Sequence, residues 1–305
     1  VNYTSLIFYS LTIDNILNII VLIILAGVSI AMLIGENGII TQAQRADELT
    51  TQAQQKEAIE LAIASVQAQG SLELDKTKLE TALQSQLGDT SYTLIENEDG
   101  SFLLQIAERS YYIDSTGEVI AEDNMIAIGT AEELKAFRDD VNSGNTYEGK
   151  YVYLTSDITL DINEEWEPIG YYQNEDPGPY DENNKPFMGI FDGRFHKIEK
   201  MYINTSDRAQ GLFGFIMYAN VKNIEIADNC EITGGLEIGG LVGYVGVGCV
   251  IENCSNRADI VAYSQVGGIV GILVECNIVN NCYNNGDIEI LNNIEGQTGG
   301  IVGYT

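Results

Sequence analysis

GGLVGYV (residues 239–245) returns along the chain as GGIVGIL (residues 267–273) and GGIVGYT (residues 299–305), with a degenerate form, QGLFGFI, at residues 210–216. The second residues of these phrases are Gly211, Gly240, Gly268 and Gly300. Their spacings are 29, 28 and 32 residues. A near-constant period of this length is typical of repeat proteins.

Other residues keep the same period. Ile232, Ile260 and Ile288 are 28 residues apart, as are Asp259 and Asp287. One unit contains three short β-like segments, GGLVGYV, CVIENCS and ADIVAYS, which suit the three sides of one coil. Such a unit cannot bury its apolar face alone, so the pattern predicts a stacked β-solenoid. The alternative fold, an antiparallel sandwich with regular turns, gives no reason for matching side chains to recur every 28 residues.

The repeated glycines have two expected roles. Glycine adopts backbone conformations closed to other residues, and it lets neighbouring backbones approach closely. The candidate repeat glycines are Gly211, Gly214, Gly240, Gly243, Gly268, Gly271, Gly300 and Gly303.

The phrases GLFG, GLVG, GIVG and GIVG resemble the GLUG motif of bacterial surface proteins and adhesins. EWEPIG (residues 165–170) and FDGRFHKIEKMYIN (residues 191–204) are similar to the lead-in coil of those domains. The resemblance covers roughly residues 129–305. It implies surface display and adhesion, and it specifies no ligand.

Upstream of the repeats, TAEELKAFRDDVNSG (residues 130–144) predicts an amphipathic helix that caps the first coil. Thr130 and Glu133 have the spacing of a capping box. Residues 75–87 predict a shorter helix that ends at Gly88, and strand-like runs follow at residues 91–96, 101–106 and 109–114. These elements suggest a small α/β head.

The composition limits the classes of partner. Lys plus Arg total 15 against 45 Asp plus Glu, a formal net charge of -30. An acidic surface of this kind repels phosphate backbones, so we expect no nucleic-acid partner. A hydrophobic fraction of 45% is that of a folded protein.

The N-terminal region is strongly apolar, with no charged residue in the 20 residues at 15–34. As a helix it would be about 30 Å long, the thickness of a bilayer core. Three interpretations compete: a single-pass membrane anchor, a buried core helix, and a filament helix that leaves the membrane to pack among copies of itself. The core helix is disfavoured because no adjacent segment offers a comparable apolar partner.

SLTIDNILNIIVLIILAGVSI (residues 10–30) resembles the N-terminal region of type IV pilin-like proteins of Gram-positive bacteria. In that family an acidic residue at the fifth mature position neutralises the terminal amine of a neighbouring subunit. If the mature chain began at Ser10, Asp14 would hold that position. The assembly residues implied by the resemblance are Asp14, Ile20, Leu22, Ile24, Leu25 and Ile30.

All five cysteines lie in the repeated C-terminal third. Asn253-Cys254 and Asn281-Cys282 occupy equivalent coil positions. Neighbouring coils are about 4.8 Å apart, within the range that a disulfide tolerates. Cys254–Cys282 or Cys249–Cys276 could therefore bridge adjacent coils, and a ladder of reduced thiols packed inward is the alternative.

Other candidate sites are weaker. NEDPGPYDENNKP (residues 174–186) predicts an exposed acidic loop, and it lacks the order of ligands of an EF-hand, so calcium binding stays a low-ranked alternative to no cofactor. His196 is interpreted as a partly packed coil residue rather than a base, and Trp166 as a plug of the first coil or of its junction with the head. Basic residues are scarce after Lys200, which disfavours an enzyme acting on acidic polysaccharides. We expect no catalytic site.

These observations predict an α+β fold with three parts. Residues 1–70 form a long pilin-like helix, residues 71–124 a small α/β head, and residues 125–305 a capped GLUG-type β-solenoid of about 28-residue coils. The expected function is a structural subunit of an extracellular type IV pilus-like filament. Its partners would be copies of itself, the membrane before assembly, and a host or surface glycan or protein. A monomeric membrane-anchored adhesin is the first alternative, and a polysaccharide-degrading β-helix enzyme is a distant one.

Overall fold

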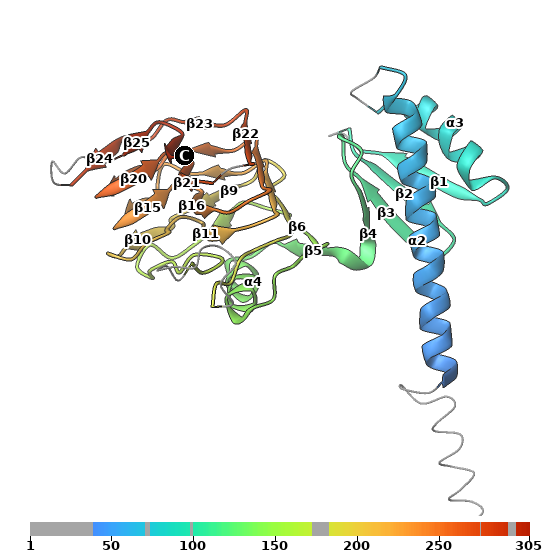
Figure 1. Cartoon of the computed structure of the whole chain (residues 1–305), viewed down its shortest axis with the longest axis horizontal. Coiled ribbons are helices and arrows are strands. Elements are labelled where there is room, and N and C mark those ends of the chain that lie inside the picture. Colours follow the sequence, from blue (N-terminus) through green and yellow to red (C-terminus); the bar gives the residue numbers. More distant parts are fainter. Residues whose placement is uncertain (1–38, 71–73, 98–99, 173–182, 275, 292–296) are drawn as a thin grey trace, which may run out of the picture. The chain divides into compact units, whose positions relative to one another are not determined.

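The computed structural model describes residues 39–70, 74–97, 100–172, 183–274, 276–291 and 297–305, with only the backbone described for residues 39–50 (Figure 1). The chain divides into two compact units, Val1–Ala121 and Glu122–Thr305. Each unit has its own hydrophobic core, and each is described by itself below.

The first unit packs two helices against a small antiparallel sheet. Its elements are α2 (Ile39–Gln67), α3 (Lys76–Leu87), β1 (Tyr92–Glu96), β2 (Phe102–Ile106), β3 (Arg109–Ile113) and β4 (Val119–Ala121). The strands are ordered β1-β2-β3-β4. Ile59, Ile63 and Val66 of α2 are buried in the same core as Leu79 and Leu83 of α3. Asp75 caps the start of α3 and Gly88 its end, so the short helix and the meander are confirmed.

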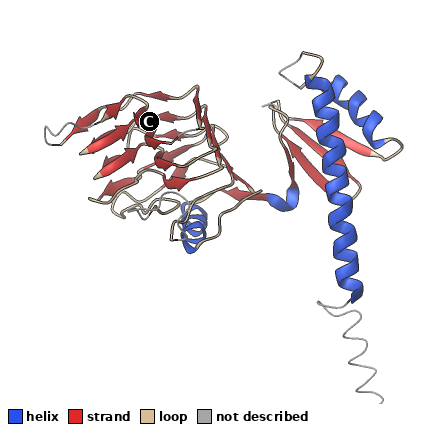
Figure 2. Ribbon diagram, in the orientation of Figure 1, coloured by secondary structure: helices blue, strands red, loops and turns tan. Residues whose placement is uncertain are grey.

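The second unit is a β-solenoid whose described strands, β5 to β26, pair in parallel with one another (Figure 2). The segment that enters it holds η1 (Glu122–Asn124), β5 (Met125–Ile128), α4 (Ala131–Ser143), β6 (Tyr151–Leu154) and β7 (Ile158–Thr159). The next coils hold β8 (Ile190–Asp192), β9 (Lys197–Glu199), β10 (Tyr202–Asn204), β11 (Phe213–Ile216), β12 (Asn220–Lys222), β13 (Glu225–Ile226) and β14 (Glu231–Thr233). The last coils hold β15 (Leu236–Gly239), β16 (Val242–Val245), β17 (Val250–Glu252), β18 (Ser255–Asn256), β19 (Asp259–Ala262), β20 (Ser264–Gly267), β21 (Val270–Leu273), β22 (Ile278–Asn280), β23 (Tyr283–Asn284), β24 (Ile288–Ile290), β25 (Thr298–Gly299) and β26 (Val302–Tyr304).

The register of the solenoid confirms the predicted period. Ile232 pairs with Ile260, and Ile260 pairs with Ile288. The six strands of the longest sheet run in the order β22-β17-β12-β8-β6-β5. The last coils fold more finely than the sequence suggested, because corners divide the three expected segments into five short strands, β15 to β19 and β20 to β24. The stacked apolar side chains form one continuous core.

Helix α4 covers the start of that core. Thr130 and Glu133 form the predicted capping box, and Leu134, Phe137 and Val141 are buried. The Phe137 ring stacks 6.0 Å from the ring of Phe191, measured between centroids. The predicted capping helix is therefore confirmed.

The expected fold class is wrong. A long pilin-like helix through residues 1–70 was the defining element of an α+β fold, but the described helix begins at Ile39 and ends at Gln67. Strands, most of them parallel, form the larger part of the regular structure in the described residues. The fold is mainly β because the backbone hydrogen bonds of residues 125–305 run largely between stacked coils.

The apolar segment at residues 15–34 lies outside the described residues, and so do the assembly residues Asp14, Ile20, Leu22, Ile24, Leu25 and Ile30. Within the described part of the chain, none of the helices combines the length and the apolar character needed to span a bilayer.

Candidate functional site

A groove on the solenoid surface, here called the asparagine groove, has a volume of about 470 Å³. It is lined by Phe195, Asn223, Ile224, Glu225, Asn253, Ser255, Asn281 and Tyr283. These residues lie at or beside one corner of the solenoid, where the sheet of β12, β17 and β22 meets the sheet of β13, β18 and β23. The volume falls within the range of small-molecule binding sites.

A ladder of side-chain hydrogen bonds runs along this corner. Asn281 Nδ2 donates to Asn253 Oδ1 at 2.6 Å, and Asn253 Nδ2 donates to Asn223 Oδ1 at 3.1 Å. Asn223 Nδ2 then donates to Asp192 Oδ1 at 3.0 Å. A carboxylate only accepts hydrogen bonds, so Asp192 fixes the direction in which every amide of the ladder points.

The backbone explains why asparagine occupies these corners. Asn223, Asn253 and Asn281 have φ angles of 55°, 54° and 48°. Apart from glycine, asparagine is among the residues that adopt this left-handed region at the lowest cost. By itself the ladder is therefore an ordinary structural device of the coil.

Phe195 has no such structural explanation. The corners after β12, β17 and β22 contain two residues each, whereas the corner between β8 and β9 contains four, residues 193–196. Arg194 and Phe195 adopt φ angles of 47° and 62°, and the Phe195 side chain is 75% exposed. A bulky residue in the left-handed region is costly, and exposure of the ring recovers none of that cost. Strain at an exposed aromatic residue leads to the hypothesis that Phe195 serves a function beyond folding.

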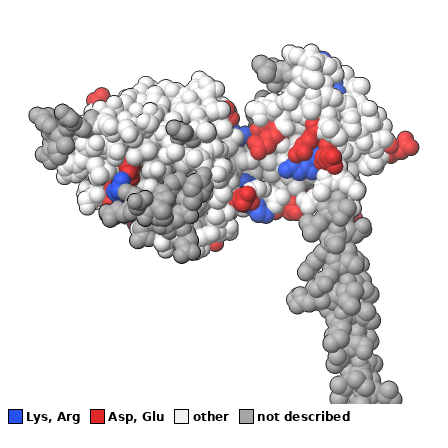
Figure 3. Space-filling view, viewed as in Figure 1, with Lys and Arg blue, Asp and Glu red and all other residues white. Residues whose placement is uncertain are grey.

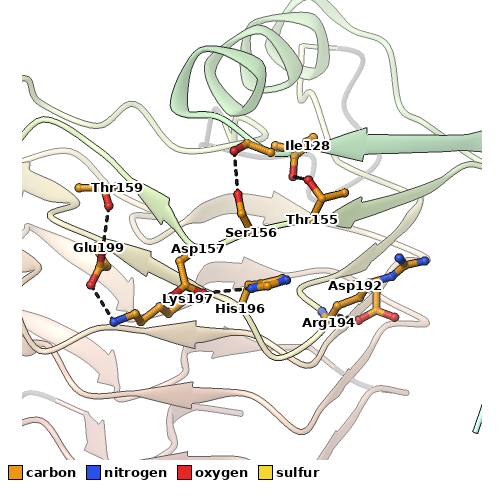
Figure 4. A network of polar contacts seen from close by, with 11 residues as sticks. Ile128, Thr155, Ser156, Asp157, Thr159, Asp192, Arg194, His196, Lys197 and Glu199 are labelled. Atoms are coloured by element: carbon orange, nitrogen blue, oxygen red, sulfur yellow. Dashed lines mark hydrogen bonds and ion pairs between the residues drawn. The ribbon is translucent and has the colours of Figure 1, made fainter. Parts of the chain in front are cut away.

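Polar contacts hold this four-residue corner in place (Figure 4). The buried Asp192 accepts from the backbone N–H of Arg194 at 2.8 Å and from the Tyr151 hydroxyl at 2.6 Å. Asp157 contacts His196 Nδ1 at 3.1 Å. Burial raises the pKa of Asp157, but hydrogen bonds from His196 and from the Lys197 backbone outweigh this effect and lower it. His196 is thus part of the corner, as expected, and it does not line the groove.

Tyr283 lies at the opposite end of the groove. It is paired in register with Ser255, which is paired in turn with Glu225. The Tyr283 side chain is 47% exposed. Glu225 is the one charged residue among those lining the groove, and its carboxylate contacts Arg257 Nε at 3.3 Å. The groove therefore offers amides and aromatic rings with little net charge.

Cys254 and Cys282 directly follow the ladder residues Asn253 and Asn281. Cys254 is buried and Cys282 is partly buried, and both thiols donate to backbone carbonyls of their own corners. A hydrogen bond with Cys254 lowers the pKa of Cys282 to about 7, while burial raises the pKa of Cys254. All five cysteines are free thiols in this structure. Asn277 rather than Cys276 is bonded to the backbone of Cys249.

The repeat glycines line the sheet of β11, β16, β21 and β26 and its approaches. A β-carbon at Gly243 or Gly271 would lie within 2.5 Å of backbone atoms in the preceding coil. Left-handed conformations occur instead at Glu237 within β15 and Gln265 within β20, with φ of 62° and 57°. Close approach between coils is therefore the main role of these glycines.

The coil between Gly234 and Val261 pairs in register with the coil that follows it. Residues 234–261 match the GLUG motif. This GLUG coil contains the ladder residue Asn253 and the thiol of Cys254. No characterised protein and no solved structure gives a significant match to this chain.

Sequence reasoning found the equivalent Asn-Cys corners but assigned their importance to the cysteines. It missed Phe195, Tyr283 and the anchoring Asp192. The spacing of Asn223, Asn253 and Asn281, 30 and 28 residues, was the available signal.

Among the described residues no cluster of three or more His, Cys, Asp or Glu side chains is placed to hold a metal. Most of the acidic loop lies outside them.

Trp166 and a second groove lie elsewhere on the solenoid. Trp166 is 3% exposed, and its indole N–H donates to the Leu212 carbonyl at 3.2 Å, so it packs within the coil core. Beside it is a groove of about 520 Å³ that includes Tyr171, Tyr172 and Arg208. Arg208 forms two hydrogen bonds with the buried carboxylate of Glu237, so its charge is already satisfied.

Proposed function

We propose that this chain is an adhesin-like surface protein whose β-solenoid carries the asparagine groove as its recognition site. The observation that supports the proposal best is Phe195, an exposed aromatic ring on a strained corner that contributes nothing to the core. Recognition residues commonly lie on turns held by a rigid scaffold. The stacked coils supply that rigidity, and the match to the GLUG motif agrees with surface display.

The proposal places the solenoid outside the cell. Its test is accessibility on intact cells that express the full chain. We expect an antibody against the solenoid to bind intact cells, and external protease to remove its epitope. Detection only after lysis would contradict surface display. Adherence of cells that lack the chain, compared with cells in which it is restored, then tests the adhesive role.

Two modes of display fit this function, a filament subunit and a monomeric membrane-anchored adhesin. The residues that would decide between them lie in the segment at 1–38, outside the described residues. Electron microscopy of sheared surface material separates the two modes. Filaments labelled by the antibody support the first, and detergent-soluble monomers alone support the second.

A further inference from the structure

We propose that the asparagine groove binds a neutral linear oligosaccharide whose chain runs along the solenoid axis. The proposal rests on the recognition function above and names the class of ligand. Three features of the groove support it: the aromatic residues at its two ends, the hydrogen-bonding capacity that remains on its asparagine amides, and its low charge.

The aromatic rings bracket the groove. Phe195 belongs to the coil of β9, and Tyr283 belongs to β23, in a sheet ordered β23-β18-β13-β9-β7. Three steps between neighbouring strands correspond to roughly 14 Å. A sugar ring has an apolar face of C–H groups that stacks on an aromatic ring. Two exposed rings at this separation suit the two ends of a short oligosaccharide.

The amides between the rings keep hydrogen-bonding capacity. A carboxamide has two N–H donors and two acceptor lone pairs. In the ladder, Asn253 uses one donor toward Asn223 and one acceptor toward Asn281. One donor and one lone pair remain at Asn253, and the same holds at Asn223. Paired donors and acceptors of this kind match sugar hydroxyls, which both donate and accept.

The charge balance disfavours an anionic ligand, and the Arg257 contact leaves Glu225 little unpaired charge for a cation. Glu225 is the only charged lining residue, and both Arg257 and the Ser255 hydroxyl contact its carboxylate. An acidic sugar would find no basic partner in the groove, and the net charge of -30 would repel it. On the face shown in Figure 3, most of the solenoid surface is likewise neither acidic nor basic. A neutral ligand requires no counter-charge.

An extended peptide fits these features less well. Peptides commonly bind by adding a strand to a free sheet edge. Here the backbone groups along the ladder are already bonded between coils: Phe195 N donates to Asn223 O at 2.7 Å, and Asn223 N donates to Glu252 O at 3.1 Å. The groove presents side chains rather than a free backbone edge.

The test uses the full chain and calorimetric titration with neutral hexasaccharides of glucose, mannose and N-acetylglucosamine, and with an oligogalacturonate as the acidic probe. We expect at least one neutral probe to bind, with an affinity that salt does not change, since no ion pair is formed. Phe195→Ala and Tyr283→Ala should each weaken binding about tenfold, the effect of losing one aromatic contact.

Tyr263→Ala is the matched control, because Tyr263 is a comparably exposed tyrosine that does not line the groove. Its affinity should equal that of the parent chain. Failure of every neutral probe, preference for the acidic probe, or binding that survives both groove variants would overturn the proposal. Surface accessibility on intact cells is independent of these titrations, so a failed ligand class and a failed surface role are distinguishable.

Discussion

Gly240 lies directly against the side chain of Asn256 in the GLUG coil, and a β-carbon at position 240 would stand 2.5 Å from Asn256 Cγ. Asn256 is fully buried, donates to Asn284 Oδ1 at 2.8 Å and also bonds the backbone of Ala258. The second glycine of the repeated phrase thus makes room for a second, internal asparagine ladder. Gly268 stands in the same relation to Asn284.

This contact predicts the cost of a single methyl group. Gly240→Ala should lower the free energy of unfolding by about 1–3 kcal/mol, because neither Asn256 nor the nearby Gly268 carbonyl can move without losing inter-coil bonds. Urea denaturation followed by circular dichroism measures the change. Gly300→Ala is the control from the equivalent repeat position, where a β-carbon meets nothing within 4 Å. Equal effects at the two positions would contradict the packing role.

The ion pair between Arg208 and Glu237 predicts that removing the arginine lowers the free energy of unfolding. The Glu237 side chain is 2% exposed and that of Arg208 is 36% exposed. Arg208→Ala should cost about 2–3 kcal/mol of unfolding free energy, since it leaves the carboxylate buried without its cation. Adding Glu237→Gln should recover part of that loss because the amide carries no charge. Lys56→Ala, at an exposed pair with Glu60, should cost only about 0.5 kcal/mol or less.

The lowered pKa of Cys282 predicts that this thiol is alkylated before the buried thiols of Cys230 and Cys249. Because the pKa of Cys282 is lowered to about 7, its reaction with iodoacetamide should accelerate as the pH rises through 7, where the thiolate becomes the major form. Burial raises the pKa of Cys230 and Cys249 to about 11, so both should stay unlabelled at that pH. Peptide mass spectrometry identifies each site.

Cys254→Ala removes the thiol that stabilises the Cys282 thiolate, and it should move the reaction profile of Cys282 to higher pH. Cys230→Ala should leave that profile unchanged, since Cys230 bonds the Met201 backbone instead. A Cys282 profile that ignores the loss of Cys254 would contradict the coupling.

The same pair tests the bridge between coils. Diamide takes two electrons and two protons from two thiols as they form a disulfide, and we expect a Cys254–Cys282 peptide pair that a reductant separates. A pair between Cys249 and Cys276 should be slower to form, because Cys276 is not the residue bonded to Cys249 across the coils. Exclusive formation of the second pair would contradict this order.

The sequence predicted the parts of the fold that repeat or that follow local rules. Ile232, Ile260 and Ile288 revealed the coil period because each side chain must enter the same core. Thr130 and Glu133 revealed the start of the capping helix because the capping box joins residues only three positions apart. The groove was harder to predict. The period places a corner near residues 193–196, but it does not show that two extra residues push Phe195 into solvent.

Phe195 also gives the most informative prediction, because stability and recognition should change in opposite directions. Phe195→Asn replaces a bulky residue at φ 62° with one that tolerates the left-handed region, and it gives up little buried apolar surface, since Phe195 is 75% exposed. The unfolding free energy should rise by about 0.5–1 kcal/mol as strain is relieved, while affinity for the neutral oligosaccharide falls. Leu236→Asn, at an exposed residue without positive φ, should leave the affinity unchanged. A stable Phe195→Asn chain that binds as tightly as its parent would show that the strained corner serves some purpose other than this ligand.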